Sequence, residues 1–367
     1  MNELALTERL VGYDTSVPGG ITKAAGFVKG WLESRDIAVT EHEIRGLPVL
    51  VASIGSQSGP TVALHGHLDV VPGHAEQFTP AMDGDRLYGR GAYDMKGGLA
   101  AMMGAVHELR DQEDVRVLFM VVPDEESEEE HERGTQYLIE QGYAPDFAIT
   151  GEPTNLHIGV QAKGVLGMRL EVSGTAAHGA TPWLGDNAVV KATDTFRTIE
   201  SLPFARESSD LYDRPSINLG RILGGDALNK VPDSCVIDID IRFLPEQDPD
   251  EIRSQVAELP DVKLIDHFTR APAIVDRDDP YVRVLTEAVS PLHETAAVSV
   301  GRDGASEVIS FIRVGIPAVE FGPVGAGHHG PAEWVSIESL ASYKQALVDF
   351  VHLIPQRLSG GRRLRIA

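Results

Sequence analysis

The sequence predicts an α/β protein in which a domain with a mostly parallel sheet, covered by helices on both faces, is interrupted by an inserted α+β domain. Two observations support this fold class. Continuous apolar runs alternate with helical patterns in both terminal parts of the chain, which is typical of parallel strands buried on both faces. In the middle part, apolar and polar side chains alternate, which indicates an antiparallel sheet with one exposed face. The expected domains are 1–163 with 275–367, and 164–274.

The elements of the larger domain follow from hydrophobic periodicity. Phe27, Val28, Trp31 and Leu32 recur at the spacing of one helix face, whereas uninterrupted apolar runs indicate buried strands. Strands are expected at 49–54, 61–64, 115–122 and 318–321. Helices are expected at 2–12, 22–35, 97–110, 279–290, 304–314 and 336–353.

The inserted domain has its own order of elements. Alternating strands are expected at 165–172, 216–222, 235–243 and 262–266, with helices at 185–201 and 248–258. This β-α-β-β-α-β order is typical of a ferredoxin-like module. Because this module is inserted into the larger domain, we expect it to act as a lid. Its antiparallel sheet has a free edge strand, so we also expect it to pair with a second copy in a homodimer.

Composition excludes several classes of partner. The net charge of the 367 residues is −23, so neither nucleic acid nor an anionic membrane surface is expected to bind. The amino-terminal residues lack a basic start with an apolar stretch, and no run reaches the ~18 apolar residues of a membrane span. A cytoplasmic protein is therefore expected. The single cysteine, Cys235, lies in a strand pattern and is expected to be a buried structural thiol.

A histidine pair marks the end of one predicted strand. The segment His65-Gly66-His67-Leu68-Asp69 follows an apolar run, and alternate side chains of a strand face the same way. His67 is expected to ligate a metal ion, while Asp69 holds its other ring nitrogen and fixes the tautomer. His65 is expected to serve packing.

Three acidic positions complete a candidate cluster with this histidine. Asp94 lies in a glycine-rich loop before a helix, where it could be a simple helix cap or a carboxylate that bridges two ions. Glu125 and Glu126 follow a buried strand; because adjacent side chains diverge, one can ligate metal while the other accepts a proton. The acidic run continues at Glu128, Glu129, Glu130 and Glu132, which are expected to be solvated.

Two further ligands are expected after other strands. Glu152 follows an apolar run, and His328 and His329 lie in a glycine-rich loop, where only one of the two is expected to bind metal. Imidazoles and carboxylates from separate loops suit two divalent cations, with Zn²⁺ preferred and Co²⁺ or Mn²⁺ also suitable.

Together these motifs resemble the dinuclear zinc amidohydrolase and exopeptidase family, which includes acetylornithine deacetylase, succinyl-diaminopimelate desuccinylase, aminoacylase and glutamate carboxypeptidase. The resemblance implies that His67 and Glu152 bind one metal, that Asp94 bridges, and that Glu126 and His329 bind the other. His329 is preferred over His328 because the family pattern places a glutamate, here Glu333, four residues later. It also implies that Glu125 is the general base and that a cis peptide bond precedes Met95.

The resemblance extends to the inserted domain. It implies that His178 stabilises the oxyanion of the reaction, and that Asn229 and Arg242 hold the substrate carboxylate, although Arg242 could also be a solvated sheet residue. Two positions depart from the pattern that deacetylases and desuccinylases often show: Glu307 stands in place of an aspartate, and Ile309 in place of an arginine that usually contacts substrate. These departures argue against acetylornithine and succinyl-diaminopimelate as substrates.

The expected function is metal-dependent hydrolysis of the amide bond of an N-acyl amino acid. A dipeptidase or carboxypeptidase with the same centre is the alternative, which would make a short peptide the substrate. A non-catalytic protein that binds metal or a ligand through an acidic cleft is a third reading, and the presence of a candidate base and oxyanion group argues against it.

Overall fold

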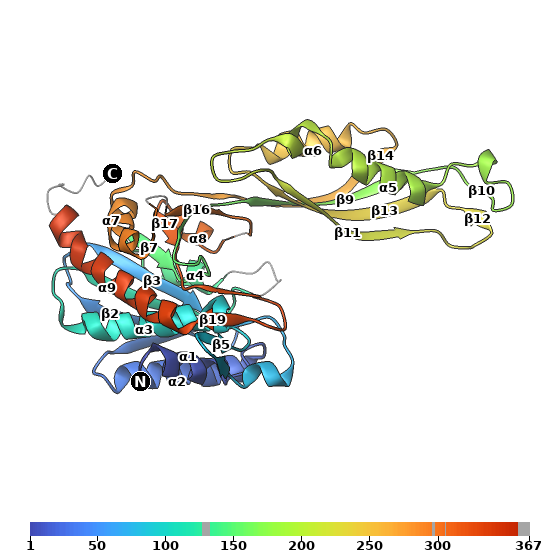
Figure 1. Ribbon diagram of the computed structural model, residues 1–367. Coiled ribbons are helices and arrows are strands. Elements are labelled where there is room, and N and C mark those ends of the chain that lie inside the picture. Colours follow the sequence, from blue (N-terminus) through green and yellow to red (C-terminus); the bar gives the residue numbers. More distant parts are fainter. Residues whose placement is uncertain (127–132, 296–297, 305, 359–367) are drawn as a thin grey trace. The chain divides into compact units, whose positions relative to one another are not determined.

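The computed structural model describes residues 1–126, 133–295, 298–304 and 306–358. The chain divides into two units (Figure 1). The first comprises Met1–Val160, Val275–Val300 and Glu307–Ala367, and the second comprises Gln161–Ile274 and Gly301–Ser306. The segment Gly301–Ser306 clusters with the second unit although it lies outside the range expected for the inserted domain. In the described part of the chain, no helix combines the length and apolar character needed to cross a bilayer.

The main sheet has parallel strands at its centre and antiparallel strands at its edges. Its order is β1-β2-β6-β3-β7-β17-β8-β15, and β16 pairs with β8. The pairs β6–β3, β3–β7 and β7–β17 are parallel, which confirms the expected parallel core. The strands are β1 Val39–Ile44, β2 Leu47–Gly55, β3 Thr61–His67, β6 Arg116–Val122, β7 Phe147–Thr150, β8 Ile158–Ala162, β15 Ala273–Ile274, β16 Ser299–Arg302 and β17 Ala318–Glu320.

The edge hairpin β1–β2 follows from its turn residues. Arg45 and Gly46 both have positive φ, 52° and 78°, which is the requirement of a two-residue type I′ turn. Strand β1 carries polar side chains and is mostly exposed, so it gives no apolar run in the sequence.

Helices lie on both faces of the main sheet. His65 of β3 contacts Thr135 and Phe311 on one face, whereas a Cβ at Gly66 would lie 2.5 Å from the Met95 side chain on the other. Capping residues set several helix starts: the Asn2 side chain accepts the first-turn N–H of α1, and Asp279 does so for α7. The helices of this unit are α1 Glu3–Val11, α2 Pro18–Glu33, α3 Gly97–Glu108, α4 Gly134–Glu140, α7 Pro280–Val289, α8 Ile309–Ile312 and α9 Ile337–Leu358.

The expected helix at 304–314 is wrong in extent. The structure has only α8 there, Ile309–Ile312, and residue 305 lies outside the described residues. Glu307 is 4 % exposed and accepts a hydrogen bond from Thr135. Because this buried contact fixes the segment before α8, the helix begins later than its apolar spacing indicates.

A small sheet joins segments that are far apart in the chain. Its order is β18-β19-β5-β4, from strands β4 Ala81–Asp83, β5 Arg86–Tyr88, β18 Gly325–Ala326 and β19 Trp334–Ser336. Trp334 pairs with Tyr88 and Ser336 with Arg86. This sheet therefore places the loop after β18 next to the loop before α3.

The second unit is a four-stranded antiparallel sheet with two helices. Its order is β11-β13-β9-β14, with β9 Gly164–Ser173, β11 Ser216–Gly224, β13 Ser234–Phe243 and β14 Val262–Arg270, and it matches the expected ferredoxin-like module. Helices α5 Ala188–Ile199 and α6 Pro249–Ala257 share a core with the sheet, in which Cys235 is buried as expected. A short ribbon of β10 Ala177–His178 and β12 Lys230–Val231 extends from the same unit (Figure 1).

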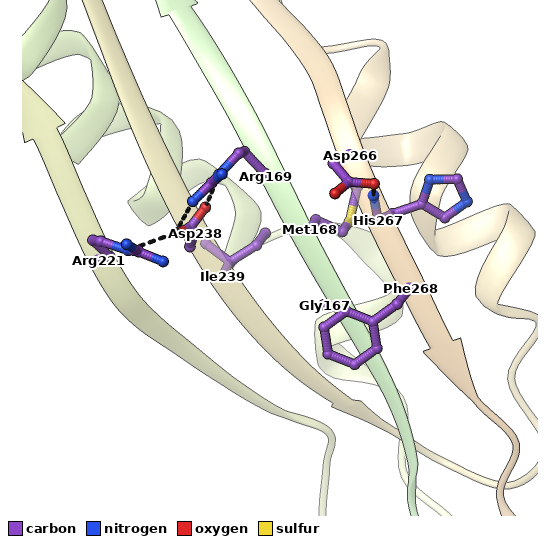
Figure 2. A pocket seen from close by; sticks show the side chains of 9 residues that line it. All are labelled: Gly167, Met168, Arg169, Arg221, Asp238, Ile239, Asp266, His267 and Phe268. Carbon is purple, nitrogen blue, oxygen red and sulfur yellow. Dashed lines mark hydrogen bonds and ion pairs between the residues drawn. The ribbon is translucent and has the colours of Figure 1, made fainter. Parts of the chain in front are cut away.

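The exposed face of this sheet carries charged side chains. Arg169 and Arg221 both donate to the carboxylate of Asp238 (Figure 2), at 2.7 Å each. They line a pocket of about 360 Å³ with Asp266 and Phe268 among the other residues. None of the site residues expected from the sequence lines this pocket.

Candidate metal centre

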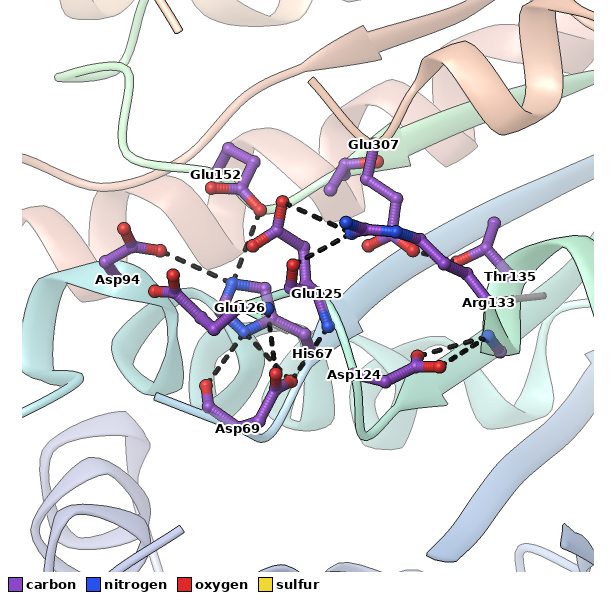
Figure 3. A network of polar contacts seen from close by, with 12 residues as sticks. His67, Asp69, Asp94, Asp124, Glu125, Glu126, Arg133, Thr135, Glu152 and Glu307 are labelled. Carbon is purple, nitrogen blue, oxygen red and sulfur yellow. Dashed lines mark hydrogen bonds and ion pairs between the residues drawn. The ribbon is translucent and has the colours of Figure 1, made fainter. Parts of the chain in front are cut away.

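The expected ligands lie at the carboxyl ends of neighbouring parallel strands. His67 is the last residue of β3, Glu126 follows β6, and Glu152 follows β7. These ends meet at one edge of the sheet (Figure 3), where open α/β sheets bind ligands. Asp94 comes from the loop before α3, and His329 from the loop between β18 and β19. The structure therefore brings together the five side chains that the sequence predicted as metal ligands.

The five side chains form two groups that share one carboxylate. In the first group, His67 Nε2 lies 3.3 Å from Asp94 Oδ1 and 3.4 Å from Glu152 Oε1. In the second, His329 Nε2 lies 3.3 Å from Asp94 Oδ2 and 2.9 Å from Glu126 Oε1. Because each oxygen of Asp94 faces a different group, this carboxylate has the geometry of a bridge.

The loop that carries Asp94 packs against the end of β3 through Met95. A Cβ at Gly66 would lie 2.5 Å from Met95 Cε, so the Met95 side chain occupies the space that the glycine leaves. The Asp94–Met95 peptide bond is cis, as the family resemblance implied. His328 does not join the cluster; its ring lies against those of Tyr93 and His329.

The tautomer of His67 is fixed by Asp69, mainly through its main chain. His67 Nδ1 lies 2.9 Å from the carbonyl oxygen of Asp69 and 3.6 Å from its carboxylate, so the carbonyl accepts the hydrogen bond. This leaves the lone pair of Nε2 pointing at the shared site. The carboxylate accepts instead from the N–H groups of Glu125 and Glu126, at 3.2 and 2.8 Å. Asp69 thus orients the acidic loop as well as the imidazole.

The carboxylates of the cluster raise the pKa values of the two histidines, so the cluster stabilises positive charge. Burial raises the pKa of Glu152 to about 7, and the nearby Asp94 carboxylate adds to the shift. Burial opposes a charge on His67, yet the carboxylates around it raise its pKa well above the usual value. Hydrogen bonds to Asp94 and Glu126 raise the pKa of His329 to about 10. Protonated imidazoles or divalent cations can both balance the carboxylates gathered here.

Unpartnered atoms show that the residues present fit a cation. His67 Nε2 and Glu152 Oε1 are buried and have no hydrogen-bond partner among the described residues. Unpaired buried polar atoms are costly. In the neutral ring with its proton on Nδ1, the lone pairs of His67 Nε2 and Glu152 Oε1 face one another at 3.4 Å, and a proton or a cation bound between them removes this cost. A set of imidazole nitrogens and carboxylate oxygens is suited to Zn²⁺, Co²⁺ or Mn²⁺.

Glu125 stands beside this cluster without belonging to either group (Figure 3). Burial raises its pKa well above the usual value. Arg133 Nη1 donates to the main-chain oxygen of Glu125 at 2.8 Å and lies 4.0 Å from its carboxylate. The acidic residues that continue this run, Glu128, Glu129, Glu130 and Glu132, lie outside the described residues.

A buried polar chain next to Glu125 was not expected from the sequence. Thr135 donates to Glu307 at 2.6 Å and lies 2.8 Å from His65 Nε2. Burial lowers the pKa of His65 to about 3, so the ring is neutral and its Nε2–H donates to Thr135. Burial raises the pKa of Glu307 to about 7. His65 therefore does more than pack, because it orients the hydroxyl that holds Glu307.

Two residues that support Asp94 were also missed. Glu333 accepts hydrogen bonds from the loop that carries Asp94, and Arg90 pairs with Glu333 at 2.8 Å. The only sequence signal was the place of Glu333 four residues after His329, which was used to choose between two histidines.

The second unit contains the remaining expected site residues. His178 of β10 lies beside Asn229, since Gly179 N–H donates to the Asn229 carbonyl at 2.7 Å. Arg242 lies near the far end of β13, and at ~3.3 Å per residue a strand of this length separates it widely from the ribbon. Its guanidinium pairs with Asp240 at 2.9 Å. The structure thus brings His178 and Asn229 together but not Arg242.

Comparisons with known proteins agree with this fold and identify the family of the chain. Residues 63–353 match the model of peptidase family M20/M25/M40. A succinyl-diaminopimelate desuccinylase from Gluconobacter oxydans is 32% identical over 332 residues, covering 83% of this chain and 84% of the relative. One from Leptothrix cholodnii is 31% identical over 319 residues, covering 79% and 81%. A tripeptidase structure from Staphylococcus aureus has a TM-score of 0.79 at 20% identity and covers 97% of this chain and 98% of that one, which shows the shared fold. The chain therefore belongs to peptidase family M20/M25/M40, and it is a metallohydrolase that acts on amide or peptide bonds.

Proposed function

We propose that this chain hydrolyses the amide bond of an N-acyl amino acid at a centre of two divalent ions, with Zn²⁺ preferred. The observation that carries the proposal is the pair of Asp94 oxygens, each 3.3 Å from a different histidine Nε2. His67 and Glu152 would hold one ion and Glu126 and His329 the other, with Asp94 between them. Ions bound there would lower the pKa of a water molecule and polarise the substrate carbonyl.

In this proposal Glu125 is the residue that moves the proton. It lies beside both groups (Figure 3) and belongs to neither, and Arg133 Nη1 lies 4.0 Å from its carboxylate. It would accept a proton from the attacking water and deliver it to the leaving amine. Asp69 would keep the acidic loop in place through the two N–H groups that it accepts.

Residues of the second unit would contact the substrate. His178 Nδ1 accepts the N–H of Ala180 at 3.0 Å, so in the neutral ring the proton lies on Nε2, ready to donate to an oxyanion. Asn229, beside it, would bind the substrate carboxylate. Arg242 would bind the same carboxylate only after its guanidinium leaves Asp240. Arg242→Lys should raise KM if Arg242 binds substrate, and should leave KM unchanged if it is only a solvated sheet residue.

The edge of the second unit supports a homodimer. Strand β11 is an edge strand of its sheet, and it exposes Ile222 and Leu223, at 38% and 54% of their surface. Exposed edges with apolar side chains tend to pair with another chain. Light scattering should give the mass of a dimer, and Leu223→Lys should yield a monomer; a monomeric wild-type chain would refute this arrangement.

The relatives named as desuccinylases favour an N-acyl amino acid as the substrate. One observation favours the alternative, a dipeptidase or carboxypeptidase: Ile309 stands where the family pattern often has a substrate-contacting arginine. A panel of paired N-acetyl, N-succinyl and dipeptide compounds, assayed with metal-loaded protein, separates the two. Turnover of N-acyl amino acids alone supports the proposal, whereas turnover of dipeptides alone overturns it in favour of the alternative. A metal-loaded protein inert on the whole panel would indicate a binding protein.

A further inference from the structure

Glu333 is a buried carboxylate, and every hydrogen bond found for it comes from a donor in one loop. Oε2 accepts from Arg90 Nη1 at 2.8 Å and from Gly91 N at 3.0 Å. Oε1 accepts from Tyr93 N at 3.1 Å and from Asp94 N at 3.0 Å. The side chain of Glu333 is 1 % exposed. This carboxylate therefore fixes the backbone of the loop that ends at the shared Asp94.

Arg90 extends the same contact to the loop that carries His329. Its Nη2 donates to the carbonyl oxygen of His329 at 3.2 Å, while Nη1 is held by Glu333. Gln77 supports this loop as well, since its Nε2 donates to the Gly330 carbonyl at 3.1 Å. His329 has a φ of 62°, a conformation that a non-glycine residue keeps only where its surroundings hold it.

In the first group, which shares Asp94 with the second, the other two side chains do not depend on these contacts. His67 ends a central strand, and Glu152 follows a neighbouring strand whose continuation is fixed by the bond from Gly151 N to the His65 carbonyl at 3.0 Å. His329, by contrast, is half exposed and lies on a loop. Its position relative to Asp94 depends on what joins the two loops.

We propose that Glu333 and Arg90 are positioning residues that set the distance between Asp94 and His329, and so determine the binding of the second cation in particular. The proposal rests on the two-ion centre proposed above. Glutamate is required because all four partners of its carboxylate are donors. In glutamine, the amide nitrogen would face the donors of either Arg90 and Gly91 or Tyr93 and Asp94, and it cannot accept from them. Arginine is required because its planar fork reaches two acceptors at once, which a lysine ammonium cannot do in the same geometry.

The experiment titrates metal-free protein with Zn²⁺ by calorimetry, and with Co²⁺ by visible absorption, for the wild type, Glu333→Gln and Arg90→Lys. We expect two equivalents in the wild type. In both variants the second equivalent should bind at least about 10-fold more weakly, because Asp94 and His329 both lose support. The first equivalent should lose less affinity, because only Asp94 of its three ligands depends on these contacts. Glu287→Gln, which removes a carboxylate from the surface pair with Arg357 in the same unit, is the matched control and should titrate as the wild type.

Each outcome is decisive. Equal weakening of both equivalents would show a general structural role and overturn the proposal, as would two unchanged equivalents or loss of folding in both variants, judged by circular dichroism of the metal-free chains. A wild-type chain that takes up fewer than two equivalents refutes the two-ion centre itself. If the wild type and both variants bind two equivalents of Zn²⁺ with the same affinities, only the role of Glu333 and Arg90 is refuted.

Discussion

The buried carboxyl of Glu307 makes the stability of the metal-free protein depend on pH in a defined way. Burial raises its pKa from 4.5 to about 7 in the folded chain, a difference of roughly 2.5 units, or about 3 kcal/mol. Because the folded pKa is the higher one, the folded state binds this proton more tightly than the unfolded state. The stabilisation is fully present below pH ~4.5 and is lost as the pH rises through ~7.

Glu307→Gln should remove this dependence, because the amide keeps the shape of the neutral acid and its oxygen can still accept from Thr135. Relative to the wild type, the variant should have a similar unfolding free energy near pH 4.5 and a higher one, by about 2–3 kcal/mol, at pH 8. The measurement is urea unfolding of both chains, with a chelator present, at pH values from 4.5 to 8.

The control for that experiment is Glu287→Gln, at a surface pair whose hydrogen bond from Arg357 lowers the carboxyl pKa. This control should gain no stability at pH 8. Parallel pH profiles for the wild type and Glu307→Gln would refute the reasoning, because they would mean that burial does not hold the proton on Glu307.

Three further predictions concern the centre itself. Glu125→Gln should leave both ions bound and reduce turnover by roughly 10²–10⁴-fold, measured by metal analysis and kcat, and retained activity would exclude Glu125 as the base. Asp69→Asn should reduce kcat by roughly 10–100-fold, because its amide nitrogen would face an N–H group of the acidic loop; an unchanged kcat would remove Asp69 from that role. Gly66→Ala should lower the unfolding free energy by about 1 kcal/mol or less, because the atom 2.5 Å from its Cβ, Met95 Cε, ends a flexible side chain that can move; a loss above about 3 kcal/mol, measured by urea unfolding, would contradict this.

The parts of the site that the sequence revealed are those with a local signature. His67, Glu126 and Glu152 each follow a recognisable apolar strand, so their convergence could be inferred from the rule that parallel strands end at one edge. Asp94 and His329 lie in glycine-rich loops without such a signal. The residues alone left Asp94 as a helix cap or a bridge and left His328 and His329 as alternatives, and only the family resemblance chose between them.

The parts that could not be read from the sequence depend on contacts between distant positions. Arg90 and Glu333 are 243 residues apart in the chain. They meet because Arg90 follows β5 and Glu333 precedes β19, and these two three-residue strands pair with each other. Strands that short give no periodicity. The expected helix at 304–314 was wrong for a related reason: the burial of Glu307 against Thr135 outweighs local helical spacing.

The central claim is that loops from distant parts of the chain hold two cations with Asp94 between them. Anomalous diffraction at the zinc absorption edge, from crystals grown with excess Zn²⁺, tests it most directly. We predict two peaks, one between His67 and Glu152 and one between Glu126 and His329, each next to a different oxygen of Asp94. A single peak, or peaks away from these side chains, would contradict the claim.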